Sequence, residues 1–177
     1  MADVLLVNAP ATDVGGDAHA SLNPPLGLAY IASALRKRGF EVEAIDFNVS
    51  GLSERRLRAT LSRTDPAVVG ISAHTETYPR GLDVAAAFKD AEPTTTVVMG
   101  GAHPSVTYET TVTEPAVDFV VVGEGDRTMP ELVAALKHGG EPRTVEGVAF
   151  ESGDGVSFTG RRPFVEDPDD LPRPARD

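Results

Sequence analysis

Short apolar runs alternate with amphipathic stretches along the first 140 residues of the chain. Each run is strand-sized and bounded by polar residues, which is typical of strands that are buried on both faces of a sheet. The pattern predicts five strands, at residues 3–8, 41–46, 67–72, 95–99 and 117–122.

The segments between these runs carry apolar residues at helical spacing. Leu28, Ile31, Ala32 and Leu35 recur at i, i+3, i+4 and i+7, and Gly39 suits the left-handed residue that ends a helix. Similar patterns predict a helix capped by Ser53, a helix over 79–91 with Leu82, Ala85, Ala86 and Phe88 facing the core, a weakly helical stretch near 105–113, and a last helix over 129–137.

A strand followed by a helix, five times over, dictates a parallel sheet with helices on both faces, because each crossover must be right-handed. Five such units suit the flavodoxin-like strand order 2-1-3-4-5. We therefore predict an α/β fold with a doubly wound, five-stranded parallel sheet.

The pattern changes after Gly140. Residues 145–151 and 156–159 alternate apolar and polar around a Ser-Gly-Asp-Gly turn, which predicts a β-hairpin. Residues 161–177 hold four prolines and many acids, which is typical of a linker or an extended tail. We expect three parts: a Rossmann-like domain over 1–140, a hairpin appendage over 141–160, and a linker over 161–177.

Composition excludes several classes of function. The chain has 177 residues, a formal net charge of −11 and no cysteine. The acidic balance argues against nucleic-acid and anionic-membrane binding, and no apolar run approaches the ~18 residues that span a bilayer. Without cysteine, this chain holds no disulfide, thiolate nucleophile or iron–sulfur cluster. No signal-peptide pattern opens the sequence, so we expect a soluble cytoplasmic protein.

Candidate chemistry gathers where the predicted parallel strands end. Ligands of such sheets bind beyond the carboxyl ends of the strands, where the strand order reverses. Gly100-Gly101 would let a flat group approach the backbone, and Ser72 could donate a hydrogen bond. His74 and His103 could ligate a metal or transfer protons. Each of these residues also has a plain interpretation, as part of a tight turn, a strand end or a solvated loop.

Motifs for other chemistries are missing from the sequence. It contains no dinucleotide fingerprint after the first strand, no Walker phosphate loop, no Gly-x-Ser-x-Gly elbow and no His-Glu-x-x-His. Gly123-Glu124-Gly125 leads toward the last helix, so its amides could face an anion or an amide ligand.

Several segments, taken in order, resemble a known family. They are NPPLGLAY (23–30) with RGFEV (38–42), VMGGAHP (98–104), VDFVVVGEGD (117–126) and DDLPRP (169–174). Together they resemble the N-terminal cobalamin-binding domain of class B, cobalamin-dependent radical SAM enzymes. Ser72 and Gly100-Gly101 are separated by the distance in sequence that separates two motifs of that family, Ser-x-Leu and Gly-Gly. In this chain His74 replaces the leucine of the first motif.

The resemblance implies a place for cobalamin. Its dimethylbenzimidazole tail would enter the sheet between the third and fourth strands, beside Ser72 and Gly100-Gly101, and its corrin would lie over the loops at the strand ends. The implied cofactor-binding residues are Asn8, Ala9, Pro10, Pro25, Leu26, Gly27, Ser72, Ala73, His74, Thr75, Gly100, Gly101, Ala102, His103, Pro104, Gly123, Glu124 and Gly125.

One mark of the wider cobalamin-binding family is missing. An Asp-x-His-x-x-Gly loop would follow the first strand, but Asp17-Ala18-His19 is followed by Leu22 at the glycine position. We therefore assign no cobalt-ligating role to His19. Radical SAM members of the family commonly lack this histidine.

The resemblance also implies a partner. A radical SAM barrel, as a further domain or a separate subunit, would hold the iron–sulfur cluster and S-adenosylmethionine, because this chain has no cysteine for that cluster. The chain alone would then bind cobalamin for methyl transfer or redox chemistry without being catalytic.

Two alternatives remain open at this point. The chain could be a degenerate domain that keeps the fold and acts as an interaction or substrate-recognition module without a cofactor. It could also be a flavodoxin-like domain for another ligand, such as a flavin or a nucleotide.

Overall fold

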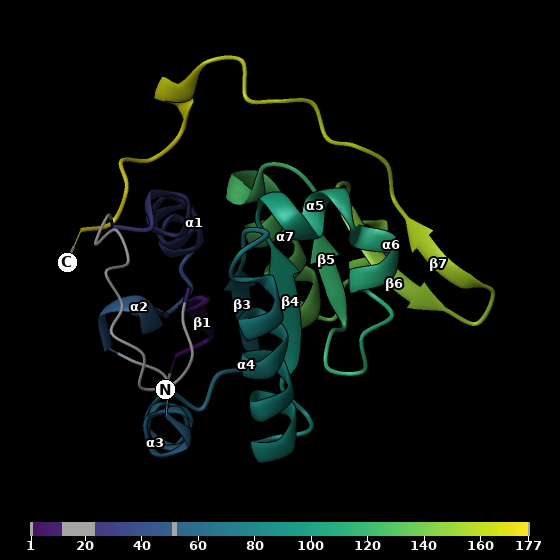
Figure 1. The fold of residues 1–177 in the computed structure, drawn as a ribbon. Helices are drawn as coiled ribbons and strands as arrows, with labels where there is room; N and C mark the ends of the chain where they lie inside the picture. The colour runs from purple at the N-terminus through teal and green to yellow at the C-terminus, as the bar shows by residue number, and fades with distance from the viewer. Residues whose placement is uncertain (1, 12–23, 51–52, 177) are drawn as a thin grey trace.

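Seven strands form one sheet in the part of the chain that the computed structural model describes, residues 2–11, 24–50 and 53–176 (Figure 1). Their order is β2-β1-β3-β4-β5-β6-β7, and the first five are parallel. The strands are β1 (Val4–Asn8), β2 (Val42–Asp46), β3 (Val68–Ser72), β4 (Thr96–Gly100), β5 (Phe119–Val121), β6 (Val148–Ser152) and β7 (Gly155–Phe158).

The predicted parallel order 2-1-3-4-5 is confirmed, and the hairpin extends the same sheet. β6 pairs antiparallel with β5, and β7 pairs antiparallel with β6. The parallel register sets Asn8 beside Ser72, and Ser72 beside Gly100, so the carboxyl ends of the central strands are level. This level edge brings the loops after β1, β3 and β4 together.

Helices cover both faces of the sheet. α1 (Leu26–Lys37) and α7 (Gly125–His138) pack against each other on one face, and α3 (Glu54–Thr64) lies beside α4 (Tyr78–Ala91) on the other. The remaining helical segments are short: α2 (Phe47–Ser50), α5 (Ala102–Val106), α6 (Tyr108–Thr111) and the 3₁₀ turns η1 (Pro142–Thr144) and η2 (Pro168–Asp170).

Local signals explain how two of these helices are bounded. The Ser53 hydroxyl accepts a hydrogen bond from the Arg56 amide at 3.3 Å, as predicted for the cap of α3. Gly39 follows α1 with φ of +87°, the left-handed conformation expected after its C-terminus.

Two helix starts differ from the prediction. α7 begins at Gly125 rather than at Met129, and α5 begins at Ala102 rather than near Ser105. Glycine and proline lower helix propensity, and they punctuate both segments, so the local pattern concealed the first turns. The four-residue helix α2 had no signal long enough to predict it.

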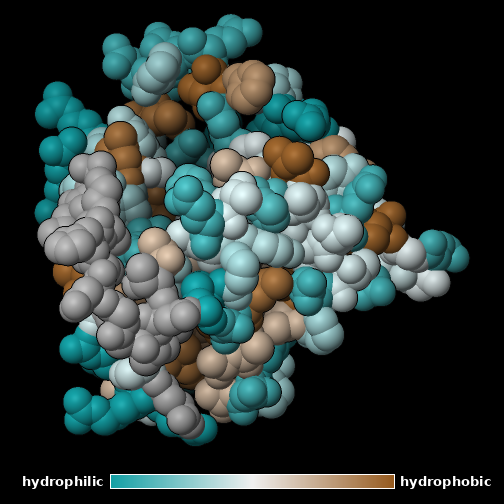
Figure 2. All heavy atoms as spheres, viewed as in Figure 1, coloured by the Kyte–Doolittle hydropathy of each residue, from teal (hydrophilic) through white to brown (hydrophobic). Residues whose placement is uncertain are grey.

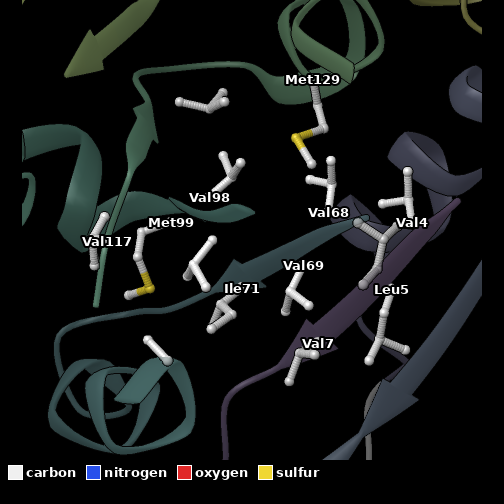
Figure 3. Packing of buried hydrophobic residues seen from close by; sticks show 14 of the residues in the cluster. Val4, Leu5, Val7, Val68, Val69, Ile71, Val98, Met99, Val117 and Met129 are labelled. Carbon is white, nitrogen blue, oxygen red and sulfur yellow. The ribbon is translucent and has the colours of Figure 1, made fainter. Parts of the chain in front are cut away.

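The core lies between the sheet and its two helical layers. Figure 3 shows Val4, Val68 and Val98 on the central strands, with Met129 of α7 nearby. In α4 the prediction needs one correction: Val84 is fully buried, whereas Ala86 is exposed. Residues two apart lie about 200° apart around a helix, so both cannot face the sheet.

The face of the molecule in Figure 2 is mostly hydrophilic, and hydrophobic side chains appear on it in small, separate groups. Among the described helices, none combines the length and the apolar character that a membrane crossing requires.

Candidate cofactor site

An open cavity of about 230 Å³ lies at the carboxyl edge of the sheet, beneath α1 and α7. Apolar side chains and glycines make most of its wall. Its lining residues are Leu6, Gly27, Leu28, Ile31, Gly70, Ile71, Ser72, Val98, Met99, Gly100, Gly101, Val121, Gly123, Glu124, Gly125, Asp126 and Met129.

Strand alternation builds the floor of this cavity. Side chains two residues apart point to the same face of a strand, so Gly70 shares its face with Ser72, and Val98 shares its face with Gly100. The register then sets Gly70 beside Val98, and Ser72 beside Gly100. The floor facing α1 and α7 is therefore poor in side-chain atoms at its centre.

The two floor glycines are not equivalent. A Cβ at Gly70 would lie 3.0 Å from both Leu6 Cδ2 and Met129 Cε, so the core already packs tightly against this position and a larger residue would have to displace these side-chain ends. A Cβ at Gly100 would meet nothing closer than the Val121 carbonyl at 3.7 Å. Space next to Gly100 is thus open to a ligand.

Gly101 is required by the backbone conformation and not by the cavity. Its φ is +100°, and a Cβ there would lie 2.5 Å from the Ala73 carbonyl oxygen. The ends of β3 and β4 approach closely at this point, and the Ala73 amide donates to the Gly100 carbonyl at 2.9 Å. The second glycine of the pair is therefore needed to join two loops.

Ser72 offers a polar group to the cavity. Its hydroxyl has no hydrogen-bond partner among the described residues, while its carbonyl accepts the Ala9 amide at 3.2 Å. The main chain holds the residue in place, so the hydroxyl is available to a ligand.

Ser105, which belongs to no site motif in the sequence, connects two loops at the mouth of the cavity. Its Oγ donates to the Gly101 carbonyl at 2.7 Å and accepts the Gly123 amide at 2.9 Å. Both glycines line the cavity. A single hydroxyl thus fixes the separation of the loops after β4 and β5.

Two carboxylates stand at the start of α7 and differ in their partners. Glu124 Oε2 accepts the Val165 amide at 3.0 Å. Burial raises the pKa of Asp126, opposed by a hydrogen bond from its own amide, and the nearby Glu124 charge raises it further. Asp126 is thus a half-buried, partly desolvated acid in a mostly apolar wall.

The two rim histidines lie outside the cavity wall. His103 Nδ1 is 3.2 Å from Thr75 Oγ1, and its ring centroid is 4.3 Å from that of Tyr78. His74 is exposed, and its amide donates to Thr77 Oγ1 at 2.9 Å. No cluster of three or more potential metal-ligating side chains occurs within the described ranges.

The structure divides the residues expected from the sequence into three groups. Seven line the cavity: Gly27, Ser72, Gly100, Gly101, Gly123, Glu124 and Gly125. Four are buried within the protein: Ala9, Pro10, Ala73 and Pro104. The other seven lie near these loops outside the wall: Asn8, Pro25, Leu26, His74, Thr75, Ala102 and His103. His19 lies outside the described residues.

Some cavity-lining residues that were not among the expected site residues could have been predicted from the sequence. Leu6, Gly70 and Val98 each precede an expected site residue of the same strand by two positions, so strand alternation alone places them on that residue's face. Met129 carried a different signal, because it shares a helical face with Leu132 and Val133 in the helix predicted over 129–137. Asp126 carried no signal of this kind, because its placement depends on where α7 begins.

The C-terminal arm (residues 161–176) runs from β7 past α7 to α1 (Figure 1). Arg162 binds Glu131 of α7 through both terminal nitrogens, the Nη1 contact being 3.2 Å. Farther along, the Ala175 amide donates to the Ala29 carbonyl of α1 at 3.0 Å. The arm thus contacts both helices that frame the cavity.

Known proteins share this sequence pattern. A protein described as an uncharacterized methyltransferase of Pyrococcus horikoshii is 35% identical over 98% of this chain and 38% of its own length. The anaerobic magnesium-protoporphyrin IX monomethyl ester cyclase of Rubrivivax gelatinosus is 32% identical over 88% of this chain and 29% of its own length. The chain therefore spans only 29–38% of the length of these relatives.

Solved structures share the fold. The radical S-adenosylmethionine methyltransferase TsrM from Kitasatospora setae, with cobalamin and an iron–sulfur cluster bound, superposes with a TM-score of 0.74 at 18% identity, over 99% of this chain and 32% of that one. The cobalamin-dependent S-adenosylmethionine radical enzyme OxsB, with aqua-cobalamin bound, gives 0.77 at 22% identity, over 98% and 24%.

The family model of the B12 binding domain matches residues 12–133, which is more than half of the chain. This match agrees with the strand order and with the cavity at the carboxyl edge of the sheet. The chain belongs to the B12-binding domain family.

Proposed function

We propose that this chain holds cobalamin for a radical SAM enzyme, with the nucleotide end of the cofactor in the cavity and the corrin over the rim. The cavity beside Gly100 carries this proposal, because it is open, mostly apolar and floored by residues with little or no side chain.

The size and chemistry of the cavity fit the nucleotide end. An apolar cavity of about 150 Å³ already accepts benzene. About 230 Å³ with an open mouth suits a flat bicyclic aromatic group that remains attached to a larger molecule. The Ser72 hydroxyl can donate a hydrogen bond to a ring nitrogen of that group.

The rim supplies polar groups for the corrin, whose edge carries many amides. Residues 73–75, 102–104 and 123–125 come from three adjacent strand ends, and His74, Thr75 and Ala102 are exposed there. Main-chain amides and carbonyls of these loops suit a neutral, amide-fringed ligand. In this role the chain binds and orients the cofactor, which supplies methyl-transfer or redox chemistry when bound.

The partner in this proposal is a radical SAM domain of the same polypeptide or a separate subunit. Relatives named as methyltransferases and cyclases are much longer than this chain. The chain has no cysteine, so the iron–sulfur cluster and S-adenosylmethionine would belong to that partner. Residues 161–177 are then the connection toward it.

Visible-absorption titration with hydroxocobalamin and methylcobalamin, followed by desalting, tests the proposal. We expect the protein to retain stoichiometric cobalamin with a base-off spectrum. The dimethylbenzimidazole base would lie in the cavity and would therefore not coordinate the cobalt. Cobalamin that is lost on desalting both from this chain and from the chain joined to a radical SAM partner would refute cofactor binding and favour a cofactor-free interaction domain.

A further inference from the structure

Asp126 is a charged group in the wall of an otherwise apolar cavity. Within the described part of the chain, Ser72, Glu124 and Asp126 are the cavity-lining residues with polar side chains. Ser72 lies at the end of β3, whereas both acids lie at the start of α7. The polar groups therefore face the cavity from two different elements.

The two acids are in different situations. Glu124 is engaged by the amide of Val165 in the C-terminal arm. Asp126 accepts from its own amide, and no described residue forms an ion pair with its carboxylate. Its half-buried carboxylate has lost part of its water without gaining a hydrogen bond from another described residue, and a ligand that donates to it would replace the lost hydrogen bonding.

The charges around Asp126 determine which kind of ligand group can lie beside it. Two carboxylates within one turn repel phosphate, so an anionic group is disfavoured beside Asp126. A neutral hydroxyl or N–H donor would satisfy the carboxylate. The nucleotide end of cobalamin offers such donors as the free hydroxyls of a ribose, which links its aromatic base to a phosphodiester. The negative charge of Asp126 and Glu124 favours an orientation in which a ribose hydroxyl, and not the phosphodiester, faces Asp126.

We propose that Asp126 is a specificity-determining residue that accepts a hydrogen bond from a ribose hydroxyl of the cofactor's nucleotide end. This inference rests on the proposed function. It assigns the recognition of the nucleotide, as distinct from the corrin, to the first turn of α7.

Cobinamide, a corrinoid that lacks the nucleotide, separates the two kinds of recognition. We expect Asp126→Ala to weaken cobalamin binding by about tenfold to a hundredfold, the range for hydrogen bonds to charged groups. Cobinamide affinity should stay unchanged. Asp126→Asn keeps an acceptor oxygen of the same shape and should recover most of the cobalamin affinity.

Controls make the result specific to this carboxylate. Asp154→Ala removes an equal charge from the exposed hairpin turn and should change neither affinity. Thermal unfolding of each variant checks that the fold is intact. An unchanged cobalamin-to-cobinamide affinity ratio in Asp126→Ala, with normal binding by the wild type, overturns this inference alone. A wild-type chain that binds neither corrinoid, with or without its partner, overturns the proposed function and the inference with it.

Discussion

At the scale of single residues, the neighbouring glycines at the end of β4 have different tasks. Gly100 leaves room on the cavity floor, whereas Gly101 allows two loops to touch. A sequence motif of two glycines cannot separate these tasks, because each depends on atoms from another strand. Substitution by alanine separates them.

Gly100→Ala should impair binding without impairing folding. The added methyl group meets Val121 at ordinary contact distance, so the free energy of unfolding should change by less than about 0.5 kcal/mol. The same methyl group occupies cavity space, and cobalamin affinity should fall about tenfold or more. Titration and urea unfolding measure the two effects, and Gly153→Ala in the open hairpin turn is the control. Unchanged affinity would show that no ligand lies against Gly100.

Gly101→Ala should behave in the opposite way and destabilise the free protein. Its positive φ and the approach to the Ala73 carbonyl predict a loss of about 2 kcal/mol or more in the free energy of unfolding. Urea unfolding measures this loss. A variant as stable as the wild type would mean that the loops after β3 and β4 can separate at little cost.

At the scale of elements, an ion pair joins the residue that precedes β1 to the last turn of α7, at the amino-terminal edge of the sheet, opposite the cavity. Asp3 contacts Lys137, and its second oxygen accepts the Glu41 amide at 2.9 Å. The hydrogen bond from Lys137 and then that from Glu41 hold the pKa of Asp3 below the ordinary aspartate range, against the effect of burial.

This lowered pKa predicts a stability contribution that disappears in acid. An acid with a lower pKa in the folded state stabilises the fold above its unfolded pKa, and this is lost as the pH falls through the folded pKa. Asp3→Asn should therefore be less stable than the wild type at pH 7, and the difference should shrink below about pH 4. Urea unfolding at both pH values measures it, with Asp154→Asn as the control. A difference that does not vary with pH would contradict the assignment.

Elements were predictable where their signals are local. The Ser53 cap and the Gly39 stop follow from patterns within a few residues. The order of the parallel strands follows from a chain of such local signals, because each strand is followed by a helix. Signals failed where distant contacts decide the outcome. The pairing of β6 with the edge of β5 is one case, and the Gly125 start of α7, which carries Asp126 into the cavity, is another.

The site was predictable to a similar degree. The Gly-Gly pair and Ser72 carry a recognisable spacing, and they line the cavity. Gly70 carries no motif, and its close packing depends on two other elements: an added Cβ would lie 3.0 Å from Leu6 of β1 and 3.0 Å from Met129 of α7. Such requirements become visible only when three elements are placed together.

At the scale of the whole molecule, the C-terminal arm is held by a charged group with little exposure. The Arg162 side chain is 17% exposed, and its Nε lacks a hydrogen bond in the described structure while lying 4.0 Å from Glu146 Oε2. Its two contacts with Glu131 make it the main polar attachment of the arm to α7.

Arg162→Ala should release the arm and leave the sheet intact. Amide hydrogen exchange should become faster at Val165 and Ala175, which bond to Glu124 and Ala29. Exchange in β3 and β4 should not change. Arg173→Ala, an exposed arginine of the same arm, is the matched control. An unchanged amide exchange rate at Val165 would show that the arm stays bound to α7 without Arg162, through its hydrogen bond to Glu124 and its own packing.

The path of this arm also determines how the protein carries mechanical load. Tension applied at residue 176 reaches the Ala175–Ala29 hydrogen bond first, and then the attachments to Glu124 and Glu131, before it reaches β7. Pulling on that end therefore loads α1 and α7, the two helices that frame the cavity, ahead of the hairpin. In a force experiment, the grip on a bound ligand would loosen before the sheet begins to unravel.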